Sequence, residues 1–238
     1  MCKRSVISLF FISSFISASC QQFGFGFLSG IATYSMQGLK NINTSVIQGL
    51  PFDAKIVDNF PAYFYYQPKM VLSFGNFAFG LVCSFQSSGS RVSAKDYSGE
   101  YRFDMKVRSN SPGIYTELRI STEDRFNFNL YSIVGPSFTN LEIQEYFNIA
   151  NTILTNSINK YKAQNYYFEP GINFQVPVKA ISFSLSLGYL IHIGDQAFYS
   201  GSDKKNVLYD TKNNVKVSPD WRGLRAGLSV CYSFIKQK

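Results

Sequence analysis

The chain alternates apolar and polar residues over eight separate segments. In the first segment, Phe23, Phe25 and Phe27 occupy every second position, with Gly24 and Gly26 between them. A period of two residues is typical of a β-strand with one apolar face. The same period predicts strands at residues 23–34, 62–74, 77–86, 113–121, 125–138, 165–176, 182–192 and 222–234.

The links between these segments alternate in length. Short links follow the second, fourth and sixth segments, whereas much longer links follow the first, third, fifth and seventh. This alternation predicts an up-and-down antiparallel barrel, with tight turns at one end and four long loops at the other.

The residue types on the two faces of the strands indicate which face points outward. One face is apolar in every segment and contains no Asp, Glu, Lys or Arg, while the other consists of Gly, Ser, Asn and Gln with a few charges. A soluble lipocalin-like barrel with an apolar interior is the alternative. Large aromatic side chains from eight strands would overfill so narrow a barrel, so we expect the apolar face to contact lipid. The sequence thus predicts an all-β fold: an eight-stranded antiparallel up-and-down transmembrane β-barrel with long extracellular loops.

The polar face then lines the barrel interior, where it places three cations and two carboxylates. These residues are Lys69, Arg119, Arg225, Glu117 and Glu169. Buried charges need partners of opposite sign, so we expect a polar network that plugs the narrow lumen. A water path through the barrel is the alternative, and it would make the protein a low-conductance pore for small solutes.

Composition excludes several classes of function. The formal net charge is +8, but charged residues make up only 16% of the chain, which argues against a nucleic-acid-binding protein. A single His and four Cys, of which Cys2 and Cys20 belong to the N-terminal segment, do not supply the ligands of a structural zinc or haem site. We therefore expect no cofactor and no metal.

The N-terminal segment, residues 1–20, has the three parts of a secretory signal peptide. Lys3 and Arg4 supply positive charge, residues 6–16 form a short apolar segment, and Ala18 to Cys20 offer small residues for cleavage. In the alternative interpretation Cys20 is a lipidated first residue, and the protein is exported in either case. We divide the chain into a signal peptide, residues 1–20, and an outer-membrane barrel domain, residues 21–238.

An export signal, eight alternating segments and a closing aromatic residue resemble the small outer-membrane barrels of the OmpA/OmpX type. Tyr232 and Phe234 end the last segment in a way that is similar to the signal read by the barrel-insertion machinery. The Phe-, Tyr-, Asn- and Lys-rich composition looks more like barrels of the Bacteroidota, such as PorT-like barrels. The resemblance implies a location in the cell outer membrane, periplasmic termini, and contact with outer-membrane lipid and lipopolysaccharide.

The long links contain patterns of their own. Residues 139–142 have the spacing of a capping box, and apolar residues then recur every three or four positions, which predicts a helix from about Asn140 to Tyr161. Residues 101–108 alternate with charges on one face and predict a strand extension beyond the barrel rather than a ninth strand. We expect the last link to be a solvated basic surface. Its lysines are Lys204, Lys205, Lys212 and Lys216.

His192, with Asp195 three residues later, is the one combination that suggests catalysis. Some barrels of this size modify lipid A with a His near the outer rim, but the Ser expected of a deacylase does not follow His192. We therefore expect a non-catalytic structural or surface-binding protein, with an extracellular or secretion-system protein as a candidate partner. The alternatives are the pore, a lipid A-modifying enzyme, and a lipocalin-like carrier of a lipophilic ligand.

Overall fold

Eight long strands form a closed ring in the computed structural model, which describes residues 22–122, 126–150, 152–201, 204–210 and 214–235. The strands are β1 (Gln22–Ala32), β3 (Tyr63–Phe74), β4 (Phe77–Lys95), β5 (Gly99–Thr122), β6 (Asn127–Ile149), β7 (Thr152–Val178), β8 (Ile181–Ile193) and β12 (Gly223–Ile235). They pair in the order β3-β1-β12-β8-β7-β6-β5-β4, and the antiparallel pairing of β3 with β4 closes the ring. The predicted eight-stranded antiparallel barrel is confirmed. The predicted signal peptide and Cys20 lie outside the described residues.

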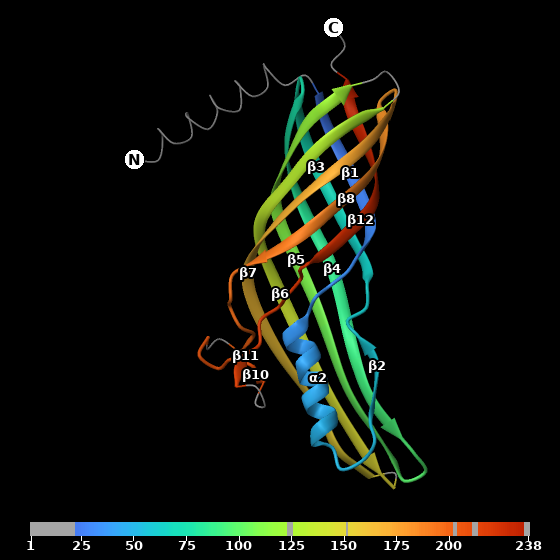
Figure 1. Cartoon of the computed structure of the whole chain (residues 1–238), viewed down its shortest axis with the longest axis vertical. Helices are drawn as coiled ribbons and strands as arrows, with labels where there is room; N and C mark the ends of the chain where they lie inside the picture. Colours follow the sequence, from blue (N-terminus) through green and yellow to red (C-terminus); the bar gives the residue numbers. More distant parts are fainter. Residues whose placement is uncertain (1–21, 123–125, 151, 202–203, 211–213, 236–238) are drawn as a thin grey trace.

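The first and last strands meet at the end of the barrel that carries the short turns. Gln22 at the start of β1 pairs with Ile235 at the end of β12, and on its other side with Ser73 near the end of β3. Two-residue turns join β3 to β4 and β7 to β8 at this end. The longer connections lie at the opposite end (Figure 1).

The outward face of the barrel is an exposed apolar belt. Leu130 is 43% exposed, whereas the preceding residue, Asn129, points inward and is 0% exposed. This alternation holds around the ring and confirms the predicted facing of the two sides. Exposed aromatic residues gather near both ends of the belt, as is typical of barrels in a bilayer. They include Phe25, Phe77, Phe183, Tyr232 and Phe234 near the short turns, and Tyr63, Phe64, Tyr66, Phe138 and Tyr166 near the other end.

Strands β4 to β7 continue far past the belt and form an extension at the end of the barrel opposite the short turns (Figure 1). The ladder between β4 and β5 is unbroken from Phe77 to Lys95, and residues 101–108 of β5 belong to it. Short strands pair with the two outer strands of the extension: β2 (Lys55–Asn59) with β4, and β9 (Tyr199–Ser200) with β7. The predicted strand extension is confirmed, and the extension is an open, curved sheet.

The predicted helix at residues 140–161 is wrong, because residues 140–149 and 152–161 form the ends of β6 and β7 and pair with each other. Their apolar residues also fit a period of two: Leu141 and Ile143 point inward and are buried. Thr139 does not cap a helix but accepts a hydrogen bond of 3.0 Å from Nε1 of Trp221. The end of β6 also pairs continuously with β5 on the edge opposite β7, and the local spacing of apolar residues cannot reveal this pairing.

The helix that the described ranges do contain lies in the first long connection. It is α2 (Gln37–Gly49), which packs along one face of the extension (Figure 1). Leu39 is completely buried, and Asn43 donates a hydrogen bond of 3.0 Å to Asn59 of β2. None of the helices in the described ranges is long and apolar enough to cross a bilayer. A small hairpin of β10 (Tyr209–Asp210) and β11 (Val215–Lys216) lies in the last connection.

The polarity of the two sheet faces reverses along the strands. In the barrel, β5 points Leu118 outward and Glu117 inward; in the extension it points Lys106 outward and Met105 inward. The inward side chains of the extension form an apolar core with α2, which includes Val92, Met105, Leu141 and Leu39. The barrel is therefore apolar outside, whereas the extension is apolar inside.

Replacing Leu141 with Asp tests this second core. A carboxylate in the apolar layer under α2 should destabilise the extension by about 3 kcal/mol or more, since a large apolar contact is lost and a charge is buried. Backbone hydrogen exchange in the parts of β5 to β7 that belong to the extension should accelerate, while exchange within the belt stays slow. The control is Asn140→Asp at the neighbouring exposed position, which should leave exchange unchanged; equal exchange in the two variants would contradict the packing.

Candidate functional site

A buried ion pair in the barrel lumen joins the two strands that flank β8. Arg225 of β12 lies 2.7 Å from Glu169 of β7, and each side chain is only 1% exposed. Arg225 also donates a hydrogen bond to Oε1 of Gln86, and its guanidinium lies 4.8 Å from the centre of the Tyr65 ring. The second oxygen of Glu169 accepts a hydrogen bond of 3.1 Å from Tyr131. Both buried charges are thus paired and hydrogen-bonded, as burial of charge requires.

A second polar cluster lies nearer the short turns. Glu117 accepts hydrogen bonds from the hydroxyl of Tyr115 and, at 3.0 Å, from Asn173. The ammonium of Lys69 lies 4.9 Å from the centre of the Tyr115 ring. Arg119 lines the same small hollow of about 50 Å³ as Lys69 and Glu117, and its Nε has no hydrogen-bond partner among the described residues.

The five residues of the predicted lumen network therefore form two clusters rather than one. The rings of Tyr115 and Tyr131 stack at 5.9 Å and connect them, because Tyr115 bonds to Glu117 and Tyr131 to Glu169. The sequence pattern identified the charges but not the tyrosines. Tyrosines occur on both faces of these strands, so the residue type alone does not indicate which of them form hydrogen bonds inside the lumen.

Two glycines make room for the ring of Tyr131. A Cβ atom on Gly171 would overlap this ring, and one on Gly188 would overlap its hydroxyl. Towards the extension, the lumen is filled by other large buried side chains. These are Tyr34, Tyr65, Tyr167, Leu190 and Trp221. The interior of the barrel is thus packed with side chains, as a narrow barrel allows.

The connections before α2 and before β12 are fastened to each other at the mouth of the barrel. Asp220 binds the guanidinium of Arg222 through both oxygens at 2.7 Å, and its carbonyl accepts the backbone amide of Met36 at 2.9 Å. Burial raises the pKa of Asp220, but the hydrogen bonds from Arg222 and Ser35 outweigh it and leave the pKa below its ordinary value. No local pattern indicates this contact, because Met36 and Asp220 come from opposite ends of the chain.

His192 points into the barrel near its mouth, where neither ring nitrogen has a hydrogen-bond partner among the described residues. Asp195 lies after the end of β8 and is exposed. Neither Asp195 nor any other described residue forms a hydrogen bond with the ring of His192, so the structure does not show the oriented base that this pair of residues suggested. The described residues contain no group of His, Cys, Asp and Glu that would hold a metal ion, and Cys83 and Cys231 are free thiols.

Tyr232 and Phe234, the predicted insertion signal, lie on the outward face of β12. Their rings contact each other at 5.0 Å, and the ring of Phe234 stacks on Phe23 of β1 at 5.9 Å. The two residues therefore continue the apolar belt across the joint between the first and last strands. Among the lysines of the last connection, Lys204 and Lys216 are exposed, and Lys212 lies outside the described residues.

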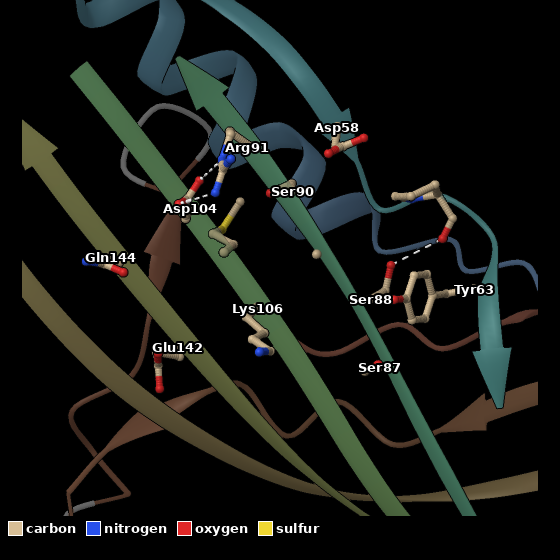
Figure 2. Close-up of a pocket in the computed structure, with 13 residues that line it drawn as sticks. Asp58, Tyr63, Ser87, Ser88, Ser90, Arg91, Asp104, Lys106, Glu142 and Gln144 are labelled. Carbon is tan, nitrogen blue, oxygen red and sulfur yellow. Dashed lines mark hydrogen bonds and ion pairs between the residues drawn. The ribbon is translucent and has the colours of Figure 1, made fainter. Parts of the chain in front are cut away.

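A polar groove of about 650 Å³ lies on the outer face of the extension, on the side of the sheet away from α2 (Figure 2). We call it the outer groove. It is lined by Asp58, Pro61, Tyr63, Ser87, Ser88, Gly89, Ser90, Arg91, Asp104, Met105, Lys106, Glu142 and Gln144. Because these residues come from β4, β5, β6 and the segment around β2, no single stretch of sequence indicates the groove.

The walls of the outer groove carry fixed polar groups beside one aromatic ring. Arg91 and Asp104 form a two-pronged ion pair with distances of 2.6 and 2.9 Å. The exposed ring of Tyr63 lies next to Ser88, whose hydroxyl donates a hydrogen bond of 3.2 Å to the carbonyl of Pro61 and holds that wall (Figure 2). Small side chains in the floor leave room for a ligand that pairs with polar groups and stacks on a ring.

No family model matches the chain, and no match was found among curated proteins. Several solved structures are similar in shape. They include Ail, the attachment invasion locus protein of Yersinia pestis, in complex with the heparin analogue sucrose octasulfate (12% identity, TM-score 0.42, covering 90% of this chain and 97% of Ail). Another is Neisserial surface protein A, with 8% identity and a TM-score of 0.37, covering 90% of this chain and 97% of that protein. A third is the outer membrane protein OprG from Pseudomonas aeruginosa, with 11% identity and a TM-score of 0.43, covering 92% of this chain and 98% of OprG.

Replacing Glu169 with Ala tests the buried ion pair. Arg225 would then be buried without its partner, so the free energy of unfolding should fall by about 3–5 kcal/mol in denaturant titrations of the protein in lipid vesicles. The double variant Glu169→Ala/Arg225→Met removes both charges and should recover a large part of this loss. If the loss in free energy of unfolding of the double variant equals the sum of the losses of the two single variants, the two side chains do not stabilise each other.

Proposed function

We propose that this chain is an integral outer-membrane barrel that has a non-catalytic role and displays a rigid binding surface outside the cell. The observation that carries the proposal is the reversal of polarity along β4 to β7. A belt of exposed apolar side chains is stable only in lipid, and an extension with an apolar core and a charged outer face is stable only in water. One continuous set of strands therefore crosses from lipid into water.

The orientation of the barrel follows from its ends. The predicted signal peptide and the closing aromatic residue support export and insertion from the periplasm, with the termini and short turns on that side. The extension then faces the environment. The Phe-, Tyr-, Asn- and Lys-rich composition supports a source among the Bacteroidota, and a PorT-like role would make a secretion-system protein the partner.

The packed lumen supports a structural role for the barrel rather than a pore. The Arg225–Glu169 pair and the buried rings around it fill the interior, so solutes have no room to pass without a rearrangement of these side chains. The unpartnered ring of His192 supports a non-catalytic role. We propose the outer groove as the place where an extracellular ligand binds, because its ion pair, hydroxyl groups and exposed ring are held by the sheet.

Labelling of single cysteines tests the proposed orientation. In a Cys83→Ser/Cys231→Ser background, Tyr97→Cys, at the fully exposed β4–β5 turn, should react with a membrane-impermeant maleimide on intact cells. Asn76→Cys, at the exposed turn at the other end, should react only after the outer membrane is permeabilised. The opposite pattern would invert the proposed orientation. Labelling of both sites in a soluble fraction would exclude the membrane barrel.

Charge on the belt should be costly. Leu130→Arg places a cation in the lipid and should lower the free energy of unfolding in vesicles by about 2–4 kcal/mol. Gln144→Arg lies on the same face of the same strand, beyond the belt and opposite Asp104, and is the matched control with an expected effect within about 0.5 kcal/mol. Folding yield is followed by the shift in gel mobility on boiling. Equal costs would mean that Leu130 does not face lipid.

A further inference from the structure

Four cations gather on the outer face of the extension, at the boundary with the apolar belt. The registers of β5, β6 and β7 place their outward residues in two parallel rows: Lys106, Glu142 and Lys160 in one, and Arg108, Asn140 and Lys162 in the other. We call the four cations the basic patch. A hollow of about 290 Å³ lies among them.

The charge of the basic patch is largely uncompensated. Glu142 is the single carboxylate in the two rows, and it lies 3.9 Å from Lys160. Lys106, Arg108 and Lys162 are exposed and form no ion pair within the part of the chain that the structure describes. Elsewhere on the extension, by contrast, Arg91 is neutralised by Asp104 at 2.6 Å.

The basic patch lies immediately beside the end of the belt. One step of two residues along the strands leads from the row of Arg108 and Lys162 to the row of Asn110 and Phe138. Such a step is about 7 Å, and Phe138 is among the exposed aromatic residues that end the belt. The long Arg and Lys side chains therefore reach the layer in which the head groups of the outer leaflet lie.

We infer that the basic patch binds the phosphate groups of the phosphorylated glycolipid of the outer leaflet. The inference rests on the proposed location in the outer membrane. A guanidinium binds phosphate oxygens in a two-pronged manner and ammonium groups add point charges, while Asn140 supplies an amide donor between them. The patch shares its outward face with the belt, so its side chains point towards neighbouring lipids rather than away from the cell. This direction favours a lipid over a soluble polyanion.

The test uses the mature chain in phosphatidylcholine nanodiscs, titrated with bisphosphorylated lipid A and followed by native mass spectrometry. Arg108→Gln/Lys162→Gln removes the two cations nearest the belt. At about 1 kcal/mol for each cation near a membrane surface, the apparent affinity should fall roughly 30-fold. Lys55→Gln/Lys95→Gln removes two exposed cations at the far end of the extension and should change the affinity less than about twofold.

Further ligands separate the sources of the anion. Dephosphorylated lipid A should bind the wild-type protein about as weakly as the phosphorylated lipid binds Arg108→Gln/Lys162→Gln. Equal binding of the two lipids, or equal losses in the two double variants, would overturn the inference. Competition by inorganic pyrophosphate at the same concentration, or tighter binding of dextran sulfate than of lipid A, would assign the patch to a soluble anion and also overturn it. A preparation without a heat-dependent mobility shift would instead refute the membrane barrel itself.

Discussion

Backbone amides and carbonyls that lie among apolar side chains must bond to one another, and the closed ring of strands meets that requirement. Within the belt, each strand pairs on both sides, including β1 with β12 and β3 with β4. Beyond the belt the constraint is lifted, because water can bond to an edge. There β1, β3, β8 and β12 have ended, and β4 to β7 continue as an open sheet with short strands at its sides. The change from closed to open sheet coincides with the change of outward residues from apolar to charged.

The same constraint decides what fills the barrel. An apolar exterior leaves the interior to the alternate residues, which are small or polar, and charges enclosed there must be paired. Arg225 and Glu169 pair directly, whereas Glu117 is held by Tyr115 and Asn173. Glycines such as Gly171 give up side-chain volume so that a tyrosine ring can cross the lumen. In the extension the inward positions are apolar instead, and α2 covers them as a helix covers a sheet in a soluble protein.

The barrel could be predicted from the sequence because its constraint is local: a strand between lipid and lumen alternates at every residue, as from Phe23 to Phe27. The extension obeys a weaker rule. Between positions 140 and 161 apolar side chains fit both a helical and a strand period, and only pairing with β5, an earlier strand of the chain, decides between them. The charges of the lumen could be named, but their division into two clusters depends on tyrosines that alternation alone does not distinguish. The outer groove draws on four segments and has no local signature.

The extension has no hinge between itself and the barrel, since β4 and β5 are paired residue by residue from the short-turn end to their far turn. A pulling force applied at that turn runs parallel to the strands. It therefore loads in shear the ladders that join these two strands to β3 and β6, with many hydrogen bonds sharing the tension at once, rather than opening them one after another. The strands that present the outer surface are also strands of the barrel wall, so the extension is anchored rigidly and transmits a load directly to the barrel.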